Sequence, residues 1–123
     1  PKQVVNVGYL NYLRPGGVVY KKSGWMEVDD VAYVEMFYVY FGIGGIVRVN
    51  LGLSRDNSYG GLYGYVTCNE AYVLEDCVQW ESGTSWWSAD VTVYRGDVIK
   101  GYAKITNPRH YVTNQAYFSI SVA

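Results

Sequence analysis

The stretch Met36–Gly52, MFYVYFGIGGIVRVNLG, decides the fold class of this chain. Met36–Phe41 is apolar at both alternating sets of positions, which is typical of a strand covered on both sides. The three glycines that follow predict a sharp bend in the backbone. Ile46–Leu51 then alternates, with apolar side chains on one face and Arg48 and Asn50 on the other. The stretch therefore predicts a buried β-hairpin that presents two polar side chains from a mostly apolar strand.

The rest of the chain is a series of short apolar runs separated by turn signals. Turns are predicted at Asn69-Glu70 and Arg95-Gly96-Asp97, and the spacing of about 8–12 residues is typical of all-β folds. No window has a convincing helical period. We therefore predict an all-β protein, an antiparallel β-sandwich or jelly roll with a concanavalin-like double sheet. The length of 123 residues indicates a single domain, 1–123.

Composition excludes several classes of partner. Half of the residues are hydrophobic, which is enough for a core at this length. Charged residues make up 17% and the net charge is −1, so no nucleic acid is expected as a partner. The charge-free run Met36–Val47 is too short to span a membrane. The opening Pro1-Lys2-Gln3 leaves the compartment open, with an extracellular or particle-surface location favoured.

The two cysteines, Cys68 and Cys77, are close enough in sequence to close a hairpin. A disulfide between them would add roughly 2–3 kcal/mol in the chain-entropy picture. The alternative is a pair of buried free thiols. A zinc site is disfavoured because His110 is the single histidine of the chain. We expect no metal and no cofactor.

A second polar face accompanies that of Arg48 and Asn50. In the segment Val78–Glu81, Gln79 and Glu81 lie on the same side of a predicted strand. We expect this strand to neighbour the strand of Asn50 in one sheet, so that the two polar faces line a single cleft. The alternative is that Glu81 is an ordinary strand-end carboxylate paired with Arg48.

Six short segments occur in an order that matches one known family. They are Asn6-Val7-Gly8-Tyr9, Ser23–Val28, Tyr40–Gly45, Asn50-Leu51-Gly52, Gln79-Trp80-Glu81 and Tyr94–Ile99. In this order they resemble the glutamic peptidases, the eqolisin family of double-sheet acid proteases. The resemblance extends over most of the chain, and each segment by itself is a weak signal.

The resemblance implies catalytic roles for Glu81 and Asn50. Glu81 falls where the family has Trp-Tyr-Glu, and would be the general base that activates water. Asn50 falls where the family has Gln-Thr-Gly, and would donate an amide hydrogen bond to the oxyanion. Because Asn50 is one methylene shorter than the family's glutamine, Gln79 is a candidate substitute donor. The resemblance thus implies a weak or inactive acid endopeptidase that acts on polypeptides.

The aromatic residues suggest another function. Tyr63, Tyr65, Trp86 and Trp87 could form a platform for sugar rings or peptide side chains, as in a carbohydrate-binding module. In the pair Trp86-Trp87, the two indoles are expected on opposite faces of their strand. The many tyrosines and glycines with few charges also favour self-association, as in a structural or surface subunit of a virion or filament. The alternative for the aromatic residues is a purely structural role.

Overall fold

The computed structural model describes residues 5–10, 19–108 and 112–123, so His110 lies outside the described residues. The described part contains strands and no helix. The strands are β1 (Val5–Leu10), β2 (Val19–Lys22), β3 (Met26–Glu27), β4 (Val34–Phe41), β5 (Gly45–Arg55), β6 (Leu62–Cys68), β7 (Ala71–Gln79), β8 (Gly83–Val93), β9 (Val98–Ile105) and β10 (Asn114–Val122).

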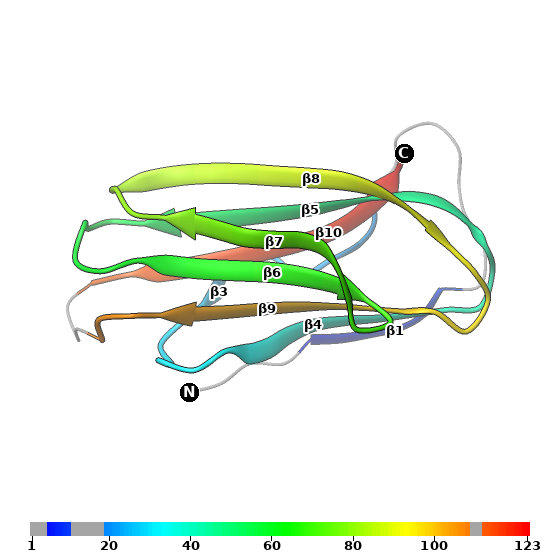
Figure 1. Cartoon of the computed structure of the whole chain (residues 1–123), viewed down its shortest axis with the longest axis horizontal. Coiled ribbons are helices and arrows are strands. Elements are labelled where there is room, and N and C mark those ends of the chain that lie inside the picture. The colour runs from blue at the N-terminus through cyan, green and yellow to red at the C-terminus, as the bar shows by residue number, and fades with distance from the viewer. Residues whose placement is uncertain (1–4, 11–18, 109–111) are drawn as a thin grey trace.

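These strands form two packed sheets, which confirms the predicted β-sandwich (Figure 1). Sheet A has the order β1-β4-β9-β6-β7, and sheet B has the order β2-β10-β5-β8, with β3 also pairing with β10. The pairings are antiparallel except that of β1 with β4, which is parallel. A parallel pair needs a long crossover, and here the chain passes through β2 and β3 of sheet B between the two strands.

The predicted hairpin between β4 and β5 is wrong, because the two strands belong to different sheets. Residues 42–44 carry the chain from sheet A to sheet B, and residues 94–97 carry it back between β8 and β9. The two crossovers are hydrogen-bonded: the Phe41 N–H donates to the Asp97 carbonyl at 2.8 Å, and the Gly96 N–H to the Phe41 carbonyl at 2.7 Å. A glycine bend permits a hairpin or a crossover equally, so the local sequence did not distinguish them.

The core lies between the inner faces of the two sheets. In β5 the predicted alternation is confirmed, since Val47, Val49 and Leu51 are buried there. Phe37 of sheet A stacks on Phe118 of sheet B with ring centroids 5.7 Å apart. β4 is covered mainly on one side, contrary to prediction: its outward tyrosines, such as the exposed Tyr40, supply the apolar character that suggested two buried faces.

A buried arginine connects the strands and loops at one end of the sandwich. Arg55, the last residue of β5, is only 4% exposed. Its guanidinium donates to six oxygens: Oδ1 of Asn114 and Asn57, and the carbonyls of Gly60, Gln79, Trp80 and Tyr59. Burial lowers the pKa of Arg55. One side chain thus fixes the ends of β5, β7 and β10 and the loop before β6, a role that no sequence pattern indicated.

Candidate functional site on the outer face of sheet B

Three rows of side chains cross the outer face of sheet B, from β10 over β5 to β8. Residues directly opposite one another define each row. The aromatic row is Tyr117–Gly52–Trp86, the polar row is Ser119–Asn50–Ser88, and the ionic row is Ser121–Arg48–Asp90. The rows arise because the side chains of all three strands alternate between the core and the outer face. We call this arrangement the outer-face site.

Gly52 makes the aromatic row possible. The six-membered ring of Trp86 occupies the space that a side chain at Gly52 would fill, since a Cβ there would lie 2.6 Å from a ring carbon. Trp25, which precedes β3, packs its ring edge-to-face against Trp86 with centroids 5.5 Å apart, and Tyr117 contacts both indoles at the same distance. Trp86 remains 55% exposed. The result is an aromatic platform that is held in place and open to solvent.

The polar row lies beside this platform and supplies hydrogen-bonding groups. The Asn50 Nδ2 donates to the hydroxyls of Ser119 at 3.1 Å and Ser121 at 3.3 Å. Among the described residues, neither the Asn50 Oδ1 nor the Ser88 hydroxyl makes a hydrogen bond. A shallow hollow of about 330 Å³ lies here, and it is lined by Asn50, Trp86, Trp87, Ser88 and Ser119. It therefore combines an indole with a free acceptor and a free hydroxyl.

The ionic row lies next to the polar row and adds no net charge. The Arg48 Nε donates to Asp90 Oδ1 at 2.8 Å, and its second nitrogen donates to Oδ2 at 3.1 Å. This bidentate pair raises the pKa of Arg48 and lowers the pKa of Asp90, through the hydrogen bonds and the opposite charges. Both groups stay ionised near neutral pH and compensate each other. The predicted alternative, Arg48 paired with Glu81, is wrong.

Glu81 and Asn50 do not share a cleft in the way the sequence suggested. Asn50 lies on β5 in sheet B, whereas β7 ends at Gln79 in sheet A, and Glu81 follows it in an exposed turn. The chain enters β8 two residues after Glu81, at Gly83, which lies opposite Arg55 of β5. Arg55 is five residues from Asn50 along β5, a distance of about 17 Å. The buried Gln79 donates its amide to the backbone carbonyl of Glu81 at 3.0 Å, not to the carboxylate. The prediction that the strand of Gln79 neighbours the strand of Asn50 in one sheet is therefore wrong.

The residue that does lie opposite Asn50 is Ser88. A hydroxyl stands at this position instead of a carboxylate, so the polar row holds no group that could act as a carboxylate base. Trp87 also borders the hollow but packs against the core, whereas Trp86 is exposed, in accord with the expectation that the two indoles lie on opposite faces.

Tyr63 and Tyr65 do not join Trp86 in one platform, because they lie on the outer face of sheet A. Tyr65 stacks on Tyr102 with centroids 4.6 Å apart and packs edge-to-face against Tyr33 and Tyr72. Tyr63 packs edge-to-face against Trp80, and the Lys104 ammonium lies 5.3 Å from its ring centroid. These tyrosines cover each other, and none of the described hollows lies among them. Period-two alternation predicts the face of the strand on which a side chain lies, but it does not predict which sheet the strand joins.

The predicted disulfide is wrong, because Cys68 and Cys77 are free. They do lie on the paired strands β6 and β7, but Cys68 is opposite Ala71 and Cys77 is opposite Gly64. Four residues of strand, about 13 Å, separate those positions, whereas a disulfide needs Cα atoms within about 7 Å. Burial raises the pKa of Cys77 to about 11, and burial also raises that of Cys68.

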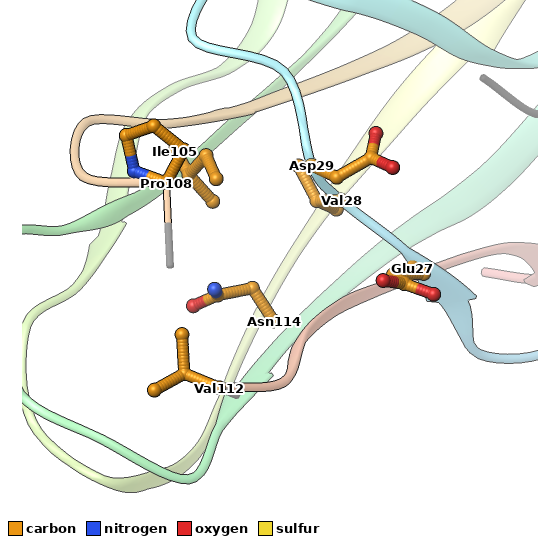
Figure 2. Close-up of a pocket in the computed structure, with 7 residues that line it drawn as sticks. All are labelled: Glu27, Val28, Asp29, Ile105, Pro108, Val112 and Asn114. Carbon is orange, nitrogen blue, oxygen red and sulfur yellow. The ribbon is translucent and has the colours of Figure 1, made fainter. Parts of the chain in front are cut away.

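A larger hollow, of about 410 Å³, lies near the buried arginine (Figure 2). Its lining residues are Glu27, Val28, Asp29, Ile105, Pro108, Val112 and Asn114. Figure 2 shows the Asn114 amide pointing into this space and the Asp29 carboxylate pointing away from it. The Asn114 Oδ1 already accepts from the Arg55 Nε at 3.0 Å. The Asn114 side chain in the wall of this hollow therefore belongs to the structural network of Arg55.

Neither the described residues nor the comparisons with known proteins assign a function to the chain. Within the described ranges, no three His, Cys, Asp or Glu side chains group to hold a metal ion, and no helix suited to crossing a bilayer occurs. No protein-family model matches the chain, and no curated protein matches its sequence. The function therefore has to be argued from the chain's own residues.

Proposed function

We propose that this protein is a glycan-binding β-sandwich, and that its outer-face site holds a neutral sugar unit against Trp86. The observation that carries the proposal is an exposed indole, fixed over Gly52, beside an unengaged amide oxygen and an unengaged hydroxyl. A pyranose ring has an apolar C–H face and a rim of hydroxyls. The first matches the face of an aromatic ring, and the second matches side chains that donate and accept hydrogen bonds.

The charge pattern favours a neutral ligand over an acidic or basic one. Arg48 and Asp90 of the ionic row neutralise each other, and the residues described as lining the hollow are all uncharged. Within the hollow itself, a charged ligand would lose hydration without gaining an oppositely charged partner. Among the alternatives, a peptidase would need a carboxylate beside Asn50, where Ser88 lies. Kinship with the glutamic peptidases stays a prediction, and binding without cleavage is compatible with it.

The test is binding of neutral oligosaccharides to the full chain. Linear hexasaccharides of β-1,4-glucose, β-1,3-glucose, α-1,4-glucose and β-1,4-mannose are screened by tryptophan fluorescence and titration calorimetry. We expect saturable binding to at least one of them. The variant Trp86→Ala should weaken it at least about tenfold, as loss of a central aromatic anchor does. Trp25→Ala should have a smaller effect, because Trp25 buttresses the platform.

Trp80→Ala is the matched control, because Trp80 is as exposed as Trp86 (54% against 55%) but its ring packs on Tyr63 of sheet A. Its affinity should equal that of the wild type. An equal loss of affinity in Trp86→Ala and Trp80→Ala would overturn the assignment of the site. Absence of binding to all four oligosaccharides, or binding only of an extended peptide used in parallel, would overturn the class of ligand.

A further inference from the structure

The edge of sheet B formed by β8 is an unusually regular strand. β8 has 11 residues, and it pairs with β5 residue by residue from Gly83 opposite Arg55 to Val93 opposite Gly45, without a register shift. Within the described part of the chain, no strand pairs with its other side. In an antiparallel ladder every second residue points its N–H and C=O away from the partner strand. β8 therefore presents a straight row of backbone donors and acceptors.

The other sheet edges carry features that discourage pairing with another chain. β7 has two register shifts against β6, a positive φ of 56° at Asp76, and exposed acidic side chains at Glu75 and Asp76. β2 has only four residues, which include Lys21 and Lys22. β1 has six residues and a register shift against β4. Bulges, charges and short length are the usual protections of an edge strand.

β8 has none of these protections. It contains no proline and no lysine, and its one charged residue, Asp90, is neutralised by Arg48 on the neighbouring strand. A net charge of −1 gives little repulsion between two copies of the chain. A strand paired antiparallel with its own copy is also self-complementary, as a two-fold axis requires.

We propose that β8 pairs antiparallel with β8 of a second copy of this chain, so that two sheets B become one continuous sheet. The pairing does not depend on the proposed glycan binding. Where both hold, the two outer-face sites lie on the same face of the joined sheet, because side chains opposite one another in an antiparallel pair point to the same face. A long oligosaccharide could then engage two sites, and its apparent affinity would exceed that of a short one through effective concentration.

The test combines oligomeric state with amide hydrogen exchange of the full chain, and it needs no glycan. Sedimentation equilibrium should show a reversible monomer–dimer equilibrium in the micromolar range. Exchange followed by NMR should show that alternate amides of β8 gain protection as the protein concentration rises, while those of β7 do not. A monomer at sub-millimolar concentration, or a dimer whose β8 amides gain no protection, would overturn the proposal.

Two proline variants locate the contact. Of the adjacent residues Ala89 and Asp90, one directs its N–H to β5 and the other directs it to the free edge. Of Ala89→Pro and Asp90→Pro, the variant that keeps the native circular dichroism spectrum should be monomeric. Asp90→Asn, which keeps the N–H, should remain dimeric. A folded proline variant that still forms the dimer excludes pairing through β8. If neither variant folds, the concentration dependence of exchange in the wild type decides.

Discussion

At the residue scale, the least foreseeable feature is the burial of Arg55. A charged side chain at the end of an apolar strand is normally expected at the surface. Here six oxygens surround the guanidinium, and no carboxylate of the described residues is hydrogen-bonded to it. Arginine suits this position because its planar fork carries five N–H groups in fixed directions. The sequence contained no sign of this network, because its carbonyl acceptors depend on where distant loops meet.

Replacement of Arg55 by lysine tests this account. Lysine keeps the charge but offers three donors from one point, so several buried carbonyls lose their partners. We expect Arg55→Lys to lower the free energy of unfolding by about 3 kcal/mol. Urea denaturation with an unchanged m-value measures the loss. Arg48→Lys, at an exposed ion pair, is the control and should have little effect. Equal behaviour of the two variants would contradict the structural role.

The candidate site illustrates what sequence can and cannot supply at this scale. Alternation placed Arg48 and Asn50 correctly on one face of their strand, and it placed Trp86 and Trp87 on opposite faces. It did not identify Ser88 and Ser119 as the neighbours of Asn50, because those contacts are set by the register of strands far apart in the chain. Serine is also common on exposed strands. Gly52 could have been a signal, since glycine inside a strand often marks a close approach.

At the scale of elements, the turn between β6 and β7 is the clearest case of local sequence dictating structure. The predicted turn Asn69-Glu70 is confirmed, with φ of 51° and 68° at its two residues. Asn69 also holds the neighbouring crossover, because its Nδ2 donates to Asp97 at 2.7 Å and its Oδ1 accepts from the Val98 N–H at 2.9 Å. Glu70 is the less favourable residue, since a left-handed conformation strains any side chain with a Cβ.

Glycine at position 70 should therefore stabilise the protein. Asn-Gly is the preferred pair for a two-residue turn of this type. We expect Glu70→Gly to raise the free energy of unfolding by about 1 kcal/mol. Glycine removes the backbone strain at this position, and the greater conformational entropy that it gives the unfolded chain offsets part of this gain. Asn69→Ala should act in the opposite direction because it removes both side-chain contacts. Thermal and urea unfolding measure the two effects, and a destabilised Glu70→Gly variant would show that the strain assignment is incorrect.

Element partners were less predictable than the elements themselves. The alternation in β5 and the glycine bend before it were recognised correctly from local sequence. Local pattern does not state which sheet a strand enters, so β4 and β5 were assigned to a hairpin and β5 and β7 to one sheet. The error over Cys68 and Cys77 has the same origin. Their strands do pair, but the register of β6 on β7 keeps the two sulfurs apart.

At the scale of the whole molecule, burial of weak acids makes stability depend on pH in the alkaline range. The pKa of Cys77 is raised to about 11, and burial also raises the pKa of Cys68, Tyr33, Tyr65 and Tyr102. A raised pKa in the folded state means that the unfolded chain releases its proton first. The associated stability is fully present below the unfolded pKa and is lost as pH rises towards the folded pKa.

We expect the free energy of unfolding to fall between about pH 9 and 11, with Cys77 contributing at most about 3 kcal/mol for a shift of two pKa units. Denaturant unfolding at a series of pH values measures this slope. Cys77→Ala should reduce stability at neutral pH, through the small cavity, yet flatten the alkaline decline. A slope identical to that of the wild type would show that the thiol does not contribute. Titration of the unfolded, unreduced chain should find two free thiols, in accord with the free cysteines.

The arrangement of the strands also bears on acid proteolysis, the activity that the resemblance to glutamic peptidases implies. A carboxylate base has to lie beside an oxyanion donor, and the chain separates its candidates: Asn50 is in the polar row opposite Ser88, and Glu81 is exposed beyond the end of β7. We therefore expect no cleavage of a denatured protein substrate between about pH 2 and 5, the range in which an ordinary carboxylate titrates. Peptide release followed by mass spectrometry measures it. If cleavage occurs, Glu81→Gln distinguishes the origins: loss of cleavage would place the chemistry at Glu81 against this geometry, and retained cleavage would place it elsewhere in the chain.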